Sequence, residues 1–250
     1  MFVPVISGLI DRRILVNYRF DSKVIEPLMP APFRPLLVKG RAIAGICLIR
    51  LKQVRPRLLP AWMGLQSENA AHRIAVEWDD ETGVRTGVYV PRRDSSSRLN
   101  ALIGGRWFPG VQHLARFQVT ETAKHLSVRL DSVDGQTHVL VEGTVATHLP
   151  ETSVFSSISD ASQFFRNGAV GYSATRTPGV YDGMELETDV WKVEPLAVER
   201  VESSWISNER LFPAGSVEFD SALLMRGIPH EWKSRPRITD GDCCAGNVRK

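Results

Sequence analysis

The chain has 250 residues, 43% hydrophobic and 24% charged, with a formal net charge of +3. This composition is typical of a soluble globular protein, and the length allows one large β-rich domain or two small ones. Pro4 interrupts the N-terminal apolar run, Asp11 ends it and no basic residue precedes it. We therefore expect neither a signal peptide nor a membrane span, and a cytoplasmic location.

Basic residues are concentrated in the first half of the chain. Residues 1–116 hold 18 Lys and Arg against 9 Asp and Glu, whereas residues 117–250 hold 13 against 19. The stretch from Pro27 to Ser67 has no acidic residue. This asymmetry predicts either an anionic partner for the first half or charge complementarity between the two halves.

The first predicted elements are a short helix and a long strand. A cap at residues 21–22 starts the helix, which ends at Leu28 because a Met-Pro pair follows. Residues 41–54 are predicted to form a strand that is apolar at first and later carries Arg50 and Lys52 on one face. If this face lines a barrel, the two charges lie in its lumen.

A hairpin and a capped helix follow. Residues 72–78 and 84–90 alternate between two faces on either side of the polar turn DDETG, which indicates two paired strands. One of the three serines at 95–97 is expected to cap a helix over residues 98–103, which a Gly-Gly pair ends.

The second half is predicted to contain one more hairpin and one more helix. Residues 126–130 and 139–145 have strand character and flank an Asp-Gly turn. Ser159 is expected to cap a helix over residues 160–167, with Gly168 as a left-handed stop.

The elements together predict one domain over residues 1–238, mostly antiparallel β with small helices, and a disordered tail over residues 239–250. Cys47 and the Cys243-Cys244 pair form neither a disulfide framework nor a CxxC pattern, so inert thiols are expected. Since GxSxG, HExxH, GxGxxG and Walker-type motifs are absent from the sequence, we expect no metal and no cofactor.

The segment PRRDSSSRLNALIGGRWFPG, residues 91–110, is the candidate anion site. It contains arginine but no lysine, and a helix start offers free N–H groups to an anion. Because successive strand residues face opposite sides, at most one of Arg92 and Arg93 is expected to point inward. In the alternative interpretation, Asp94 pairs with an arginine and the serines only cap the helix. The candidate substrate-binding residues are Arg92, Arg93, Ser95, Ser96, Arg98, Arg106, His72 and His113.

Three segments carry a family resemblance. SENAAHRIAVEW, GVYVPRRDSSSRLNALIGGRWFPGVQHLARF and FPAGSVEFDSALLMR resemble the YqjF-like proteins, a bacterial family of unknown function related to acetoacetate decarboxylase. The resemblance covers roughly residues 18–232. It implies a cone-shaped antiparallel β-barrel with a polar lumen and a few short helices, a mainly β (α+β) fold, and a tendency to form homo-oligomers.

The resemblance also locates the catalytic positions. The decarboxylases hold a catalytic lysine and a second lysine after a Gly-Phe-Pro motif, and the matching segment GGRWFPGVQH places Gly110 and Val111 there. Schiff-base chemistry therefore lacks its amine, unless Lys52 substitutes from another strand. Glu68 matches a glutamate of the decarboxylase site and is the candidate catalytic residue, either as a general base or as the partner of an arginine.

These observations favour a barrel that binds a small anionic, carboxylate-type metabolite in its lumen, with lysine-independent lyase or isomerase chemistry on a keto acid as its enzymatic version. Two alternatives stay open. One is a non-catalytic scaffold barrel, and the other is a binder of nucleic acid or another polyanion through the basic first half. The last would show a steep salt dependence, because each neutralised phosphate releases counterions.

Overall fold

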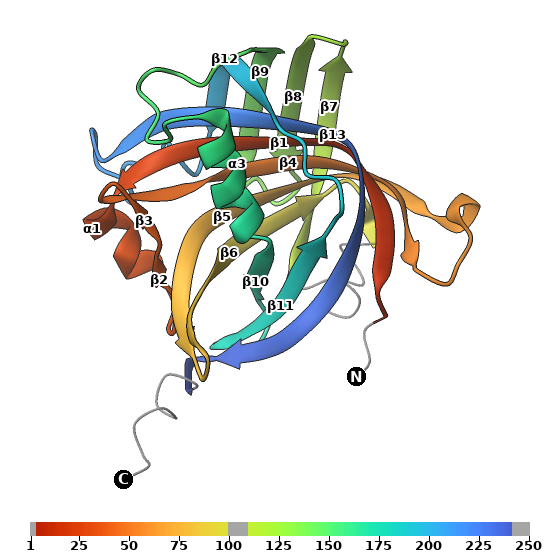
Figure 1. Ribbon diagram of the computed structural model, residues 1–250, viewed down its shortest axis with the longest axis horizontal. Coiled ribbons are helices and arrows are strands. Elements are labelled where there is room, and N and C mark those ends of the chain that lie inside the picture. The colour runs from red at the N-terminus through yellow and green to blue at the C-terminus, as the bar shows by residue number, and fades with distance from the viewer. Residues whose placement is uncertain (1–3, 100–109, 242–250) are drawn as a thin grey trace.

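The computed structural model describes residues 4–99 and 110–241 (Figure 1). The helical elements are α1 (Ser22–Ile25), η1 (Glu26–Leu28), η2 (Ala61–Met63) and α3 (Ile158–Asn167). The strands are β1 (Ile6–Asp21), β2 (Arg34–Pro35), β3 (Leu37–Val38), β4 (Arg41–Pro56), β5 (Leu65–Asp80), β6 (Gly83–Ser95), β7 (Gln112–Glu121), β8 (His125–Ser132), β9 (His138–Val145), β10 (Val170–Ala174), β11 (Val180–Glu187), β12 (Glu194–Ser203) and β13 (Val217–Thr239).

The strands form one sheet that closes on itself twice. Five strands, in the order β13-β1-β4-β5-β6, are common to both closures. The first closure runs from β6 through β10 and β11 back to β13, and we call it the cavity barrel. The second runs from β6 through β7, β8, β9 and β12 to β13, and we call it the core barrel.

Two long strands make this double closure possible. β13 has 23 residues, pairs with β12 near Leu224 and pairs with β11 from Glu231 to Thr239. β6 pairs with β10 at residues 88–90 and with β7 at residues 93–95. Figure 1 shows β13 as a long curved strand that passes from the region of β12 to β11.

Side chains on the shared strands point alternately into the two chambers, as the period of two in a strand requires. One face packs Ile14, Ile46 and Leu48 against Val128 and Val141 of the core barrel. On the opposite face, Leu15, Cys47 and Ala75 pack against Ala161 and Phe165 of α3. Both faces of the central sheet are therefore buried.

The mainly β fold class with few short helices is confirmed, and both predicted hairpins form, as β5–β6 and β8–β9. The sheet is mixed rather than purely antiparallel, because β6 pairs in parallel with both β10 and β7. A strand that changes from one closure to the other meets partners arriving from distant parts of the sequence, so the connections need not be hairpins.

The helix predictions need two corrections. Asp21 caps α1 as expected, accepting a hydrogen bond from the backbone N–H of Lys23. The cap of α3 is Ser157 rather than Ser159, since its hydroxyl accepts from the N–H of Asp160. Gly168 has φ −84°, so the expected left-handed stop was wrong. In the third expected helix Arg98 and Leu99 are helical, and the rest lies outside the described residues.

The C-terminal strand extends slightly past the expected domain boundary at residue 238. Thr239 still pairs with Val180, and Asp240 accepts a hydrogen bond from the Tyr181 hydroxyl. The remainder of the expected tail, residues 242–250, lies outside the described part of the chain. No helix among the described residues is long and apolar enough to cross a membrane.

Candidate functional site

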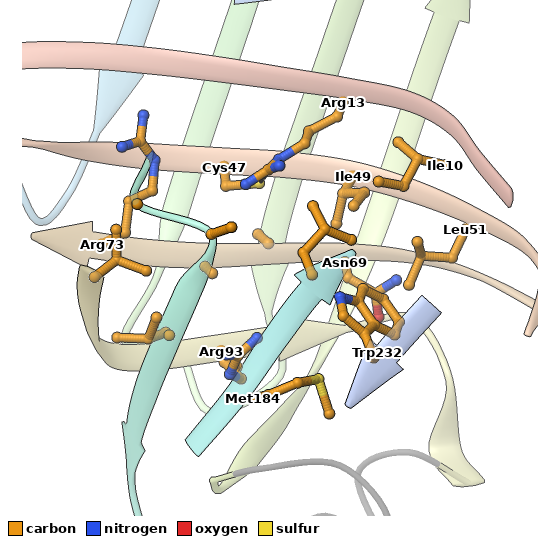
Figure 2. Close-up of a pocket in the computed structure, with 18 of the residues that line it drawn as sticks. Ile10, Arg13, Cys47, Ile49, Leu51, Asn69, Arg73, Arg93, Met184 and Trp232 are labelled. Carbon is orange, nitrogen blue, oxygen red and sulfur yellow. Dashed lines mark hydrogen bonds between the residues drawn. The ribbon is translucent and has the colours of Figure 1, made fainter. Parts of the chain in front are cut away.

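The candidate site is a cavity of about 140 Å³ inside the cavity barrel (Figure 2). Its wall comes from the shared strands, from β7, β10, β11 and from the C-terminal end of α3. Apolar side chains such as Ile49, Val90 and Met184 form much of this wall. The polar lining residues in the described part are Arg13, Cys47, Asn69, Arg73, Arg93, Gln112 and Trp232.

Three arginines give the cavity its charge. Arg13 comes from β1, Arg73 from β5 and Arg93 from β6, and Figure 2 shows all three among the lining side chains. No Asp, Glu or Lys is found among the described residues of the lining. Uncompensated buried charge is costly, so a chamber of this composition favours a bound anion.

Each arginine is held by a neutral or soft partner. Arg13 Nε donates to Cys47 Sγ over 3.3 Å, and Arg93 Nε donates to Ser173 Oγ over 2.9 Å. Arg73 donates through Nη2 to the side-chain oxygen of Asn17, and its guanidinium carbon lies 4.7 Å from the ring centroid of Phe165. These contacts fix the guanidinium groups without neutralising them.

Two buried N–H groups of these arginines have no acceptor among the described residues: Nη1 of Arg13 and Nε of Arg73. Arg73 as a whole residue is only 3% exposed. A buried donor without a partner costs free energy, which a ligand oxygen would recover. These two groups are therefore unsatisfied among the described residues, as is Nε of Arg12 on the opposite face of β1.

Burial lowers the pKa of two of the three arginines. The pKa of Arg73 falls to about 10 because of burial, with Cys47 opposing this shift and the charge of Arg13 adding to it. Burial also lowers the pKa of Arg93 to about 10, again with Cys47 opposing. Both guanidinium groups stay protonated at neutral pH, so the cavity remains positive.

Arg92 lies on the face opposite to Arg93. Its guanidinium pairs with Asp94 at 2.8 Å and with Asp134 at 2.9 Å, and it does not line the cavity. Burial raises the pKa of Asp94, and the hydrogen bond from Arg92 opposes this shift. The interpretation in which Asp94 pairs with an arginine thus applies to Arg92, whereas Arg93 points into the chamber.

The serines of this segment support the site from outside it. Ser95 donates to Asn69, a cavity residue, over 2.7 Å and accepts from the N–H of Ser97. Ser96 is exposed and accepts from the backbone N–H of Glu68. Arg98 is exposed, and the expected contact of Arg106 lies outside the described residues.

Glu68 lies in the core barrel and not in the cavity. It accepts from Arg12 and from Arg50, each at 2.6 Å, and both arginines also pair with Glu121. The Arg12 side chain is fully buried and that of Glu68 is 16% exposed. Of the two roles considered for Glu68, the geometry is that of a partner of arginine.

The two candidate histidines do not line the cavity. His72 is buried, packs edge-on against Trp205 with centroids 5.0 Å apart, and has no described partner for Nε2. Burial lowers its pKa to about 4, with a further contribution from Arg92. His113 is partly exposed and lies 3.0 Å from Asp134. The described residues hold no cluster of three or more His, Cys, Asp or Glu suited to a metal ion.

The two positions matched to the decarboxylase lysines lie at the edge of the chamber. Gly110 is buried with φ +75°, and an added Cβ would lie 2.5 Å from Cβ of Ser173. A lysine at residue 110 would be strained in this backbone. Gln112, one residue past Val111, lines the cavity and pairs with Arg93 in the sheet. Lys52 pairs with Asp11 and does not line the cavity.

Arg13 and Arg73 line the cavity and were not predicted from the sequence, whereas the inert thiol expected for Cys47 stays a prediction. Arg73 belongs to the face of β5 opposite to His72 and Ile74. Its neighbours on that face, Ala71 and Ala75, are small, which is compatible with a second buried layer. Arg13 shows the same pattern on β1, where it shares a face with Leu15. A charged residue among apolar residues that alternate with a period of two indicates a buried polar site.

The acid-free basic stretch is largely neutralised inside the fold. Five of its seven basic side chains pair with carboxylates outside the stretch, in the pairs Arg34–Glu77, Arg34–Asp79, Arg41–Glu218, Arg50–Glu68, Lys52–Asp11 and Arg57–Glu231. Of these pairs, Arg41–Glu218 and Arg57–Glu231 join the two halves of the chain, and the other carboxylates belong to the first half itself. This arrangement disfavours the stretch as a polyanion-binding surface.

Comparisons with solved structures show the fold. Acetoacetate decarboxylase from Legionella pneumophila superposes with a TM-score of 0.60 at 11% identity, covering 94% of this chain and 88% of that one. An acetoacetate decarboxylase-like enzyme from Sphingomonas wittichii RW1 gives 0.54 at 13% identity, covering 96% and 92%. The enduracididine biosynthesis enzyme MppR complexed with pyruvate gives 0.56 at 12% identity, covering 97% and 93%.

Sequence comparison adds the family. No curated protein matches the chain. The model of DUF2071, described as an uncharacterized conserved protein (COG2071), matches residues 10–227. With its double-closed sheet and its acetoacetate decarboxylase-like fold, the chain is thus a member of the DUF2071 family.

Proposed function

We propose that this protein binds a short keto acid in the cavity, with the carboxylate held by Arg13, Arg73 and Arg93. The observation that carries the proposal is the presence of three arginines in the lining of a chamber whose described lining has no acidic residue. Arginine binds carboxylate through paired N–H groups, and the three arginines of the lining have no carboxylate partner among the described residues.

The size of the cavity limits the ligand. A cavity of similar volume holds a molecule of about six non-hydrogen atoms such as benzene. The volume of about 140 Å³ therefore fits an acid with the dimensions of pyruvate or acetoacetate and excludes a nucleotide. The MppR structure with pyruvate supports the same ligand class, since that protein shares the fold.

Any chemistry in this chamber proceeds without a lysine amine. The described lining contains no lysine, and Gly110 does not accommodate a side chain without strain. Arginine is not a nucleophile because it stays protonated. It can still stabilise negative charge that develops on a ligand oxygen, which is what an enolate of a keto acid requires. The proposed enzymatic version is therefore lyase or isomerase chemistry through an enolate.

Isothermal titration calorimetry with pyruvate and with its neutral analogue pyruvamide tests the binding function. We expect pyruvate to bind more tightly, and Arg93→Met to weaken it about tenfold or more, the cost of losing a charged hydrogen bond. Arg116, exposed on β7, provides the control, and Arg116→Met should leave the affinity unchanged. Equal affinity for the two ligands, or no loss in both Arg93→Met and Arg73→Met, would contradict the proposal.

A further inference from the structure

The sulfur of Cys47 lies inside the positive chamber. Cys47 belongs to β4, is 7% exposed and lines the cavity, and its Sγ accepts the hydrogen bond from Arg13 Nε. Figure 2 shows the Arg13 guanidinium beside this sulfur, with Arg73 and Arg93 among the other lining side chains. Cys47 also affects the pKa of both Arg73 and Arg93, as described above.

A second observation concerns the positive charge around the thiol, which no described carboxylate of the lining neutralises. Arg73 is 97% buried, lines the same cavity and keeps its Nε without an acceptor among the described residues. The sulfur of Cys47 accepts its hydrogen bond from Nε of Arg13, so it does not satisfy Nε of Arg73. The arginines thus leave capacity for an anion next to Cys47.

We propose that Cys47 is a reacting group of this cavity, and that it forms a covalent bond with the electrophilic carbon of a short carboxylate held by the arginines. The inference rests on the proposed binding function and adds to it the reactive residue and the ligand class. That class is carboxylates of about pyruvate size that carry an electrophilic carbon next to the carboxylate.

Elementary chemistry supports this role. The sulfur anion is the nucleophilic form of cysteine, and the sulfur of Cys47 accepts a hydrogen bond from the guanidinium group of Arg13. With a keto acid, the sulfur attacks the carbonyl carbon, a C–S bond forms, and the π electron pair moves to the carbonyl oxygen. The proton released by the thiol ends on that oxygen. The product is a hemithioketal, and nothing is oxidised or reduced.

The hemithioketal differs from an imine in its capacity to accept electrons. A hemithioketal has no cationic nitrogen that could accept the electron pair of a breaking C–C bond. The Cys47 adduct is therefore suited to holding and orienting the acid, or to proton transfer at the neighbouring carbon. It is not suited to decarboxylation by the lysine route.

The test uses two alkylating reagents that are similar in size and differ in charge. Iodoacetate carries a carboxylate and iodoacetamide is neutral; in both, the sulfur displaces iodide from the same type of carbon. The protein carries Cys243→Ser and Cys244→Ser, so that Cys47 is its one thiol. Mass spectrometry follows the modification rate at Cys47, and glutathione in the same buffer provides the reference ratio.

We expect the iodoacetate-to-iodoacetamide rate ratio at Cys47 to exceed that of glutathione by about tenfold or more, the range of electrostatic focusing in a charged cleft. Arg93→Met should reduce the iodoacetate rate and leave the iodoacetamide rate nearly unchanged. Arg116→Met should change neither rate. Pyruvate should slow the modification by occupying the cavity. A ratio equal to that of glutathione, or a Cys47 that reacts only in urea, overturns the inference.

Calorimetry with Cys47→Ser separates this inference from the binding function. If Cys47→Ser still binds pyruvate while the alkylation ratio of the parent protein equals that of glutathione, the binding function stands and the role of Cys47 falls. If pyruvate binds neither protein and the ratio is also flat, both fall. A high ratio with protection by pyruvate supports both.

Discussion

The two faces of the shared strands hold buried arginines under opposite conditions. Arg12 points into the core barrel, where Glu68 and Glu121 neutralise it. Arg13, its neighbour in sequence, points into the cavity barrel, where its described hydrogen-bond partner is the sulfur of Cys47. Two adjacent residues of β1 therefore differ in their surroundings: Arg12 belongs to an ion-pair network, and Arg13 has no described carboxylate partner.

The same division recurs on the neighbouring strands. His72 and Arg92 face the core barrel, whereas Arg73 and Arg93 face the cavity. On one face the fold satisfies its charges internally, so these residues contribute to stability. On the other face it leaves charges unsatisfied, so these residues are available for binding. The burial of a charged side chain does not by itself distinguish residues that stabilise the fold from residues available for binding. The presence of a carboxylate partner does.

The largest expected effect comes from breaking the closed network. Glu68→Gln removes the charge that faces the fully buried Arg12, and we expect the free energy of unfolding to fall by about 3 kcal/mol. Urea denaturation measures this change, and pyruvate binding by the folded fraction should be unaffected. A variant that keeps its stability and loses binding would place Glu68 in the site instead.

A pH titration of stability tests the buried histidine on the same face. Burial holds the pKa of His72 at about 4, against 6.5 in the unfolded chain. The unfolded state therefore binds a proton first as the pH falls, and stability is lost from about pH 6.5 down to about pH 4. Between pH 7 and pH 5 the loss from His72 amounts to about 2 kcal/mol.

His72→Leu should remove this part of the pH dependence, because leucine does not titrate. His230, whose pKa burial also lowers to about 4, is present in both proteins, so the difference between their denaturation curves isolates His72. Parallel curves from pH 7 to pH 5 would show that His72 does not control this region of the profile.

On the cavity face, the loss of an arginine should change the stability of the ligand-free protein much less than Glu68→Gln does. Arg73→Met removes a buried charge that has no described carboxylate partner, so we expect ligand-free stability to change by less than about 1 kcal/mol. Thermal denaturation without ligand measures this. A loss as large as that of Glu68→Gln would mean that Arg73 stabilises the fold rather than serving a ligand.

The smallest expected effect concerns Schiff-base formation, for which we expect no adduct. Because Gly110 and Val111 replace the decarboxylase lysines, treatment with acetoacetate followed by borohydride should leave the mass of the protein unchanged. A lysine-dependent decarboxylase of this fold, treated in parallel, provides the positive control. An adduct on Lys52 or on any other lysine would restore Schiff-base chemistry as the leading mechanism.

Local pattern was enough to predict much of the sheet. The alternation at residues 72–78 and 84–90 and the Asp-Gly turn at 134–135 predicted both hairpins, since side-chain period and turn chemistry are local properties. The helix caps were less accurate. Ser157 and Ser159 are both acceptable caps by residue type, and the structure uses Ser157.

The candidate site was predicted in part. Alternation correctly limits the inward arginines of the pair Arg92–Arg93 to one, but it does not identify which, because that depends on where β6 changes its partner. Arg13 and Cys47 lie 34 residues apart and meet through the pairing of β1 with β4. No spacing in the sequence indicates such a contact.

The sequence by itself determined the strands β4, β5, β6, β8 and β9, the absence of the decarboxylase lysines and the excess of arginine in the first half. Tertiary structure decided which face of each strand looks into which chamber, because the two closures of the sheet join residues remote in sequence. It also decided which arginines receive a carboxylate. Arg12 and Arg13 have the same side chain, and their surroundings differ because neighbouring strand residues point to opposite faces.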